Sequence, residues 1–210
     1  MSTPSRIPRI GWAIAFAAGA AVLALAWTQL KTARRPALPP LPELATAPDF
    51  AFTAQTGAPV KRADLAGKIW ITDFIFTRCA GPCPVMTERL SELQRALAVG
   101  PDDVRLVSVT VDPEYDSPAV LKKYAERFGA DPARWFFLTG DPAAIETFST
   151  RGMLLALAKD GEGAPIHSQK FVVVDQSGRI RAYHDLADPA LLPNLLQDIE
   201  NLRQEARASR

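Results

Sequence analysis

The feature that most constrains the fold is an apolar segment, residues 69–76, followed at once by two cysteines and a helix-forming stretch. The segment is rich in aromatic and β-branched residues, which is typical of a buried strand. From Pro82 onward, apolar residues recur at positions 86, 90, 93 and 97, which is the spacing of one helix face. Proline also suits the first turn of a helix. Cys79 and Cys83 therefore lie at a junction between a strand and a helix.

The same alternation of strand and helix continues along the chain. Further strands are predicted at residues 49–52, 104–111, 135–139, 170–174 and 179–183. Further helices are predicted at residues 117–128, 141–150 and 189–206. Alternation implies parallel strands joined by right-handed crossovers, and the hairpin at the end adds antiparallel strands. The predicted fold is α/β and thioredoxin-like, with a mixed central sheet flanked by helices.

The N-terminal segment differs from the rest. Residues 10–30 carry no charged side chain, and as a helix they would span roughly 31 Å, about the thickness of the hydrocarbon core of a membrane. Trp12 and Trp27 lie near the two ends, as in an interfacial aromatic belt. We expect a transmembrane anchor here, and a signal peptide cleaved near residues 24–26 is the alternative.

This division predicts four segments: a cytoplasmic N-terminus at 1–9, the anchor at 10–30, a basic and proline-rich spacer at 31–42, and a folded domain at 43–210. A semi-extended spacer would hold the domain roughly 20 Å from the membrane. Basic residues flank the anchor almost equally on both sides, so they do not decide its orientation. Cysteine chemistry favours the periplasmic side of a bacterial inner membrane for the domain.

Charge excludes one class of partner. The first 42 residues hold five of the 24 Lys and Arg residues and none of the 23 acidic residues, so the remainder has a balance of −4. A mildly acidic domain lacks the positive surface of a nucleic-acid-binding protein, and no nucleic acid is expected as a partner.

The Cys-x-x-x-Cys spacing of Cys79 and Cys83 admits three interpretations. A stapling disulfide would close a five-residue loop and contribute only about 2 kcal/mol. A redox-active dithiol needs nothing beyond the two cysteines. A metal site is the third interpretation: on one helical turn the two Cβ atoms would lie about 5–6 Å apart, and soft thiolates select Cu(I) or zinc. Two thiolates alone make an incomplete site, so a metal needs another ligand.

The two histidines and one buried acid complete the list of candidates. His167 precedes the strand at 170–174 and would lie beside the cysteines in a thioredoxin-like sheet. It is the candidate third ligand, in a set suited to Cu(I) and able to take Cu(II) with an extra ligand. His184 is expected at the solvated surface. Asp73, inside the apolar strand, is expected either to pair with a nearby helix or basic residue or to orient the metal-binding residues.

Four blocks of sequence carry a resemblance to the Sco/SenC family of copper-binding assembly factors. They are residues 67–87, 107–124, 135–140 and 167–178, and the first block, which contains both cysteines, is the most specific. The resemblance implies a thioredoxin-like fold with an N-terminal membrane anchor, and copper bound by the residues that match the family ligands: Cys79, Cys83 and His167. Two departures are a short segment between Gly152 and His167, and Ile166 where the family often carries an aspartate.

The function implied by this resemblance is that of a copper chaperone rather than an enzyme. Family members assist assembly of the dinuclear copper site of cytochrome c oxidase subunit II, by delivering copper, by reducing its cysteines, or both. Expected partners are subunit II or a similar copper acceptor, an upstream copper donor and a thiol reductant. The alternative is a thiol–disulfide oxidoreductase that uses Cys79 and Cys83 alone. A peroxidase of the peroxiredoxin type is disfavoured, because Thr77 lies two residues before Cys79 instead of three.

Overall fold

The computed structural model describes residues 19–25, 27, 39–155, 157–159 and 165–209. The chain divides into two compact units, Met1–Leu38 and Pro39–Arg210. In the first unit the described residues 19–25 and 27 are helical. No helix among the described residues is both long and apolar enough to cross a membrane. The rest of the anchor predicted at 10–30 lies outside the described residues.

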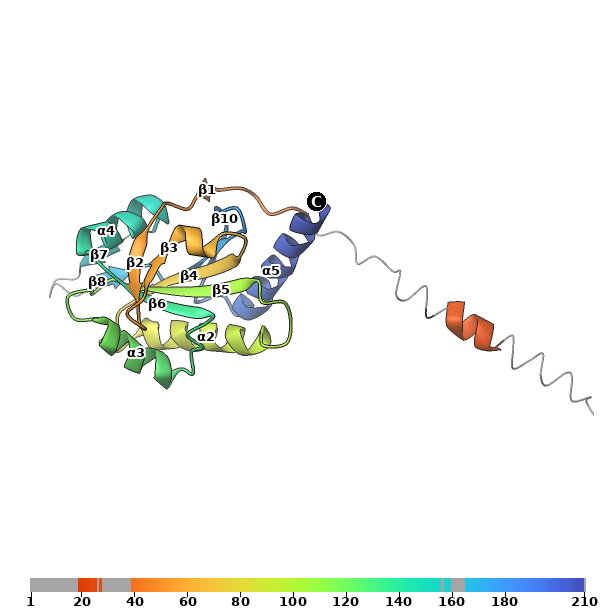
Figure 1. Ribbon diagram of the computed structural model, residues 1–210, viewed down its shortest axis with the longest axis horizontal. Coiled ribbons are helices and arrows are strands. Elements are labelled where there is room, and N and C mark those ends of the chain that lie inside the picture. Colours follow the sequence, from red (N-terminus) through yellow and green to blue (C-terminus); the bar gives the residue numbers. More distant parts are fainter. Residues whose placement is uncertain (1–18, 26, 28–38, 156, 160–164, 210) are drawn as a thin grey trace, which may run out of the picture. The chain divides into compact units, whose positions relative to one another are not determined.

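The second unit is built on an eight-stranded mixed sheet with the order β1-β10-β9-β4-β5-β6-β2-β3 (Figure 1). Its strands are β1 (Ala45–Thr46), β2 (Ala51–Ala54), β3 (Pro59–Lys61), β4 (Ile69–Ile75), β5 (Val104–Thr110), β6 (Trp135–Thr139), β9 (Lys170–Val174) and β10 (Arg179–Asp185). Strands β4, β5 and β6 are parallel, as the alternation of strand and helix predicted. All other neighbouring pairs are antiparallel, so the sheet is mixed.

Helices cover both faces of this sheet (Figure 1). The helices α2 (Pro82–Ala96), α3 (Pro118–Arg127) and α5 (Leu191–Ala208) pack on one face. The 3-10 turn η1 (Arg62–Leu65), the helix α4 (Pro142–Thr147) and the π-helical turn η2 (Phe148–Gly152) pack on the other. Ser117 and Asp141 cap α3 and α4 with their side chains, as expected for residues that precede a proline-led first turn.

Side-chain alternation along β4 divides the apolar core in two. All seven residues of β4 are buried. Ile69, Ile71 and Ile75 belong to the core that includes α2, α3 and α5, whereas Phe74 belongs to the core that includes α4 and η2. Because alternate residues of a strand share a face, Asp73 points to the same side as the isoleucines. The strand therefore carries a carboxyl group into the core beneath α2.

Residues 39–42, predicted as part of an extended spacer, instead contact the folded unit. The Leu41 N–H donates to Glu205 Oε1 at 2.9 Å. The Arg181 guanidinium donates to the carbonyl of Leu41 at 2.5 Å and to that of Pro42 at 3.1 Å. A buried arginine on β10 thus satisfies carbonyls that a free spacer would leave to water, and the contacts of the unit begin at Pro39.

Candidate functional site

The two cysteines lie where β4 gives way to α2. Cys79 lies in the turn after β4, where its N–H donates to the Phe76 carbonyl at 3.2 Å, and it is partly exposed. Cys83 is the second residue of α2 and is fully buried. We expected the two cysteines to share one helical turn. They do not, because α2 begins only at Pro82 and Cys79 precedes it. The structure contains no bond between the two sulfur atoms.

Burial dominates the chemistry of Cys83. It raises the pKa of the Cys83 thiol, and a hydrogen bond with the Cys79 sulfur and the nearby charges of Cys79 and Asp73 raise it further, while the Phe76 backbone lowers it in part. The first turn of α2 is held by Thr87, whose hydroxyl donates to the Cys83 carbonyl at 2.9 Å. Cys83 is therefore a protonated, enclosed thiol at neutral pH, and Cys79 is the accessible member of the pair.

Asp73 is buried beneath this pair. Neither carboxyl oxygen has a hydrogen-bond partner among the described residues, so the predicted pairing with a basic residue or a helix is wrong. Burial raises the pKa of Asp73 to about 7. Ser108 faces it across the β4–β5 pairing and lowers that pKa in part, although it makes no well-formed hydrogen bond to it. The group is close enough to Cys83 and Tyr124 for its charge to affect both.

The loop between β5 and α3 contacts Arg78, the residue before Cys79. Arg78 Nη2 lies 2.6 Å from Asp112 Oδ2, and the Arg78 guanidinium lies 4.2 Å from the centre of the Tyr115 ring. This contact was not predicted from the sequence. Arg78 and Asp112 belong to the first and second of the blocks that carry the family resemblance, but nothing in those blocks indicates that the two side chains pair.

The backbone of His167 lies at the same end of the sheet as Cys79. It belongs to a two-stranded ribbon in which β8 (Pro165–His167) pairs with β7 (Leu157–Lys159), and His167 lies opposite Leu157. Two residues later β9 begins, and the antiparallel pairing of β9 with β4 places this start beside the end of β4. The side chain of His167 lies outside the described part of the chain.

His184 was expected at the solvated surface, but the structure places it elsewhere. Its side chain is largely buried between β10 and α5, with Nε2 2.7 Å from Asp198 Oδ2. Asp198 therefore occupies the Nε2 atom of His184 within the fold. We do not count His184 among the candidate metal ligands, and it serves as a control in the copper-binding test.

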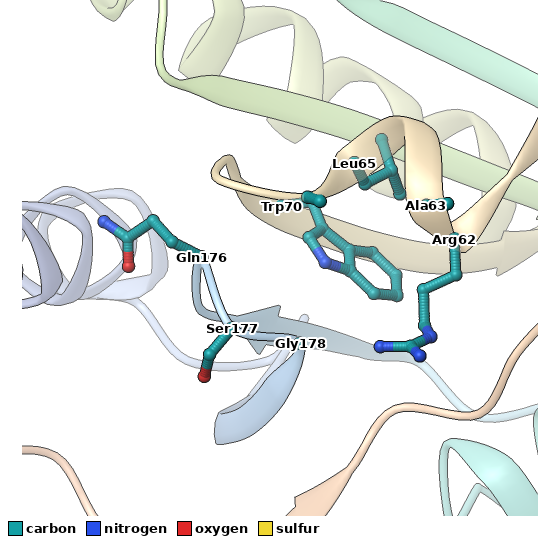
Figure 2. A pocket seen from close by; sticks show the side chains of 8 residues that line it. Arg62, Ala63, Leu65, Trp70, Gln176, Ser177 and Gly178 are labelled. Atoms are coloured by element: carbon teal, nitrogen blue, oxygen red, sulfur yellow. The ribbon is translucent and has the colours of Figure 1, made fainter.

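A cavity of about 260 Å³ lies at the opposite end of β4 from the cysteines (Figure 2). It is lined by η1, by Trp70 near the start of β4, and by the turn at 176–178. Figure 2 shows the Trp70 indole between the Arg62 side chain and this turn. Arg62 is paired with Asp49 at 2.6 Å. The cavity therefore takes no part in the cysteine site.

Fold and site together define a mixed α/β protein with a cysteine pair where a parallel strand meets a helix. The SCO1/SenC family model matches residues 40–202, and the chain belongs to this family. The chain is 34% identical over 154 residues to the SCO1 protein homolog of Bacillus subtilis (strain 168), which covers 72% of this chain and 80% of the relative.

Solved structures agree with this assignment. The structure of BsSco, a member of the Sco family of cytochrome c oxidase assembly proteins with a disulfide switch, matches with a TM-score of 0.70 at 32% identity, over 78% of this chain and 98% of that one. The structure of Bradyrhizobium japonicum ScoI with copper bound matches with a TM-score of 0.62 at 28% identity, over 76% of this chain and 99% of that one. Similarity therefore extends over nearly the whole of these two solved chains.

Proposed function

We propose that the chain is a copper chaperone that takes copper on Cys79, Cys83 and His167 and assists assembly of the dinuclear copper site of cytochrome c oxidase subunit II. The observation that carries the proposal is the cysteine pair, one member partly exposed and the other enclosed, at the end of the sheet where the His167 backbone lies. The copper-bound ScoI relative and the assembly role named for BsSco support it.

The donor set fits copper as a cargo. Two soft thiolates and an imidazole suit Cu(I), and Cu(II) would need one further ligand. Because Cys83 is held as a protonated thiol, loading must release its proton, and the affinity for Cu(I) rises with pH. The partly exposed Cys79 gives the donor and acceptor proteins a ligand that they can reach before the enclosed one.

Redox state controls the loading of copper in this proposal. Oxidation of Cys79 and Cys83 to a disulfide removes two protons and two electrons, and a disulfide offers no thiolate to the metal. A thiol reductant returns the two electrons and restores the site. The Cys83 thiol is hydrogen-bonded to Cys79, so the two groups that would form the disulfide are already neighbours.

The place of action in this proposal is a bacterial inner membrane, with the thioredoxin-like domain in the periplasm and Asp73 orienting the cysteines from below. A single-pass anchor at residues 10–30 would keep the site near a membrane-bound acceptor and raise its effective concentration. Protease treatment of intact spheroplasts tests the topology: the domain should be digested from outside. A domain that is protected until the membrane is broken would rule this topology out.

The proposal is tested by copper binding to the full-length reduced protein in a mild detergent. One Cu(I) per chain is expected, with an X-ray absorption spectrum that fits two sulfur ligands and one nitrogen ligand. Cys79→Ser and Cys83→Ser should each lower the affinity by at least tenfold. Stoichiometry and spectrum that stay the same in both variants would exclude the cysteines as ligands.

A second candidate function, a thiol–disulfide oxidoreductase, is favoured by one observation. An accessible thiol beside an enclosed one is suited to attack on a partner's disulfide, because Cys79 can form the mixed disulfide and Cys83 can then displace the partner. This function needs no histidine. Reduction of an oxidised acceptor at the wild-type rate by His167→Ala, together with weak copper binding in both proteins, would favour it over the first.

A further inference from the structure

The loop at residues 112–116, between β5 and α3, holds a buried carboxyl group that reaches the cysteine turn. Asp116 is 0% exposed. It accepts a hydrogen bond from the Thr77 N–H at 3.1 Å, a second from the Thr77 hydroxyl, and a third from the Thr110 hydroxyl at 2.5 Å. One side chain therefore joins the ends of β4 and β5 to the start of α3.

The same loop also binds Arg78, the residue after Thr77. Arg78 is bound by Asp112 through two nitrogen atoms, at 2.6 and 3.2 Å, and lies over the Tyr115 ring. The Asp112 N–H in turn donates to the Thr110 hydroxyl at 3.0 Å. Thr77 and Arg78, the two residues before Cys79, are thus both attached to the 112–116 loop.

These contacts surround a turn that has few others. Cys79 lies outside α2, and its N–H makes one turn hydrogen bond, to Phe76. The direction in which the Cys79 thiol points depends on the backbone of Thr77 and Arg78. Of the groups that hold this backbone, the Asp116 carboxyl is the buried one with a hydrogen bond to the main chain itself.

We propose that Asp116 is a positioning residue of the cysteine site: through Thr77 it holds Cys79 in the orientation that copper binding requires, and it stabilises the dithiol form relative to the disulfide. The inference rests on the proposed function of Cys79 and Cys83 as ligands. It does not depend on the charge of Asp116, because the three contacts are directional hydrogen bonds to fixed atoms.

A second buried aspartate offers a matched control. Asp175 is 6% exposed and likewise accepts several hydrogen bonds, from Ser177, Arg179 and Arg181. It lies at the end of β9, beside the start of β4, and therefore at the far end of the sheet. Its removal should cost stability without changing the cysteine turn.

The test measures two properties of the full-length protein: the affinity of the reduced form for Cu(I) and the midpoint potential of the Cys79–Cys83 pair. Asp116→Ala should weaken Cu(I) binding about tenfold and favour the disulfide about tenfold, a shift of about 30 mV to more negative potential. Thr77→Val, which removes one of the three hydrogen bonds, should produce part of both effects. Asp175→Ala should change neither property.

Asp116→Asn separates geometry from charge. The amide oxygen can accept from the Thr77 N–H and from Thr110, and the amide nitrogen can donate to the Thr77 hydroxyl oxygen. This variant should stay within about threefold of the wild type in both measurements. An asparagine variant as impaired as the alanine variant would overturn the geometric account.

The remaining outcomes are also decisive. Equal changes in Asp116→Ala and Asp175→Ala would show a general loss of stability and refute the positioning role. If Asp116→Ala does not fold, unchanged affinity and potential in Thr77→Val refute it instead. A wild-type protein that fails to bind Cu(I) contradicts the proposed function, while the potential still tests the positioning of Cys79.

Discussion

At the scale of single residues, Asp73 is the group whose environment differs most from water. It is fully buried, its oxygens have no hydrogen-bond partner among the described residues, and burial raises its pKa to about 7 from 3.8. The folded state therefore holds a proton that the unfolded state releases between about pH 4 and pH 7. This contribution to stability is complete below the unfolded pKa and is lost as the pH rises through the folded pKa.

We predict that the free energy of unfolding of the reduced protein decreases by about 4 kcal/mol between pH 4 and pH 8 through Asp73 alone. Asp73→Asn cannot ionise and should remove most of this decrease, so the variant should be the more stable protein at pH 8. Urea unfolding at several pH values measures it. A wild-type slope that persists in Asp73→Asn would show that the proton is bound elsewhere.

Asp175 is a control whose pKa is shifted in the opposite direction to that of Asp73. Burial would raise the pKa of Asp175, but hydrogen bonds from Ser177, Arg179 and Arg181 outweigh it and lower the pKa. Its contribution to stability is therefore present above the unfolded pKa and lost as the pH falls. Asp175→Asn should alter the acid side of the profile and leave the decrease above pH 5 in place.

The two thiols should also differ in reactivity. Cys79 is partly exposed, whereas Cys83 is fully buried and its pKa is raised by burial and by its neighbours. Because the thiolate is the reactive form, iodoacetamide should modify Cys79 at least tenfold faster than Cys83 at neutral pH. Peptide mass spectrometry of a time course resolves the two sites. Equal rates would mean that α2 opens faster than the reagent reacts.

The sequence located some of these residues and not others. Cys79, Cys83 and Asp73 stand out because they interrupt, or follow directly, an apolar strand. Asp116 does not, because an acidic residue in a loop is normally exposed, and its burial results from hydroxyl and amide donors on two other segments. Tertiary contacts of this kind leave no periodic pattern in the sequence.

At the scale of elements, long apolar segments were predictable and short pairings were not. The predicted segments at 69–76, 104–111 and 135–139 are strands β4, β5 and β6, within one residue at each end. By contrast, β1 and β3 have only two and three residues and form because a neighbouring strand offers its edge. The predicted helix at 141–150 ends in the π-helical turn η2, whose altered hydrogen bonding has no sequence signal of its own.

Arg181 is one of the residues that attach the segment 39–42 to β10 and α5, beside Glu205 and Asn201. Arg181 is 7% exposed and pairs with Asp175 at 2.8 Å and with Glu205 at 2.6 Å. Arg181→Ala leaves these acids without their partner and should cost about 3–5 kcal/mol of the free energy of unfolding. Limited proteolysis should then cut near residue 41 before the rest of the domain.

An exposed arginine on the same strand is the matched control. Arg179 pairs with Glu43 at 3.4 Å, with side chains that are 47% and 61% exposed. Arg179→Ala should cost less than about 1 kcal/mol, since such surface pairs contribute little. Equal costs for the two variants in chemical unfolding would mean that the buried cluster is no more important than a surface pair.

At the scale of the whole molecule, the candidate site residues lie together at one end of the sheet. The two cysteines, the backbone of His167 and the 112–116 loop lie where β4 and β5 end and β9 begins, whereas the cavity and Asp175 lie at the other end. The family match over residues 40–202 covers almost all of the folded unit. The order of strands and helices was predictable from periodicity. The proximity of these segments was not, because it depends on the register of the strands in the sheet.

The proposed metal site uses one histidine, and the chain contains two. His184 is held by Asp198 within the fold, so His184→Ala is a control for general damage. The most direct measurement is a Cu(I) titration of the reduced full-length protein against a competing chelator, for wild type, His167→Ala and His184→Ala. We expect tight binding of one ion in the wild type, at least a tenfold loss of affinity in His167→Ala, and wild-type affinity in His184→Ala. Equal affinity in His167→Ala and the wild type would contradict the account.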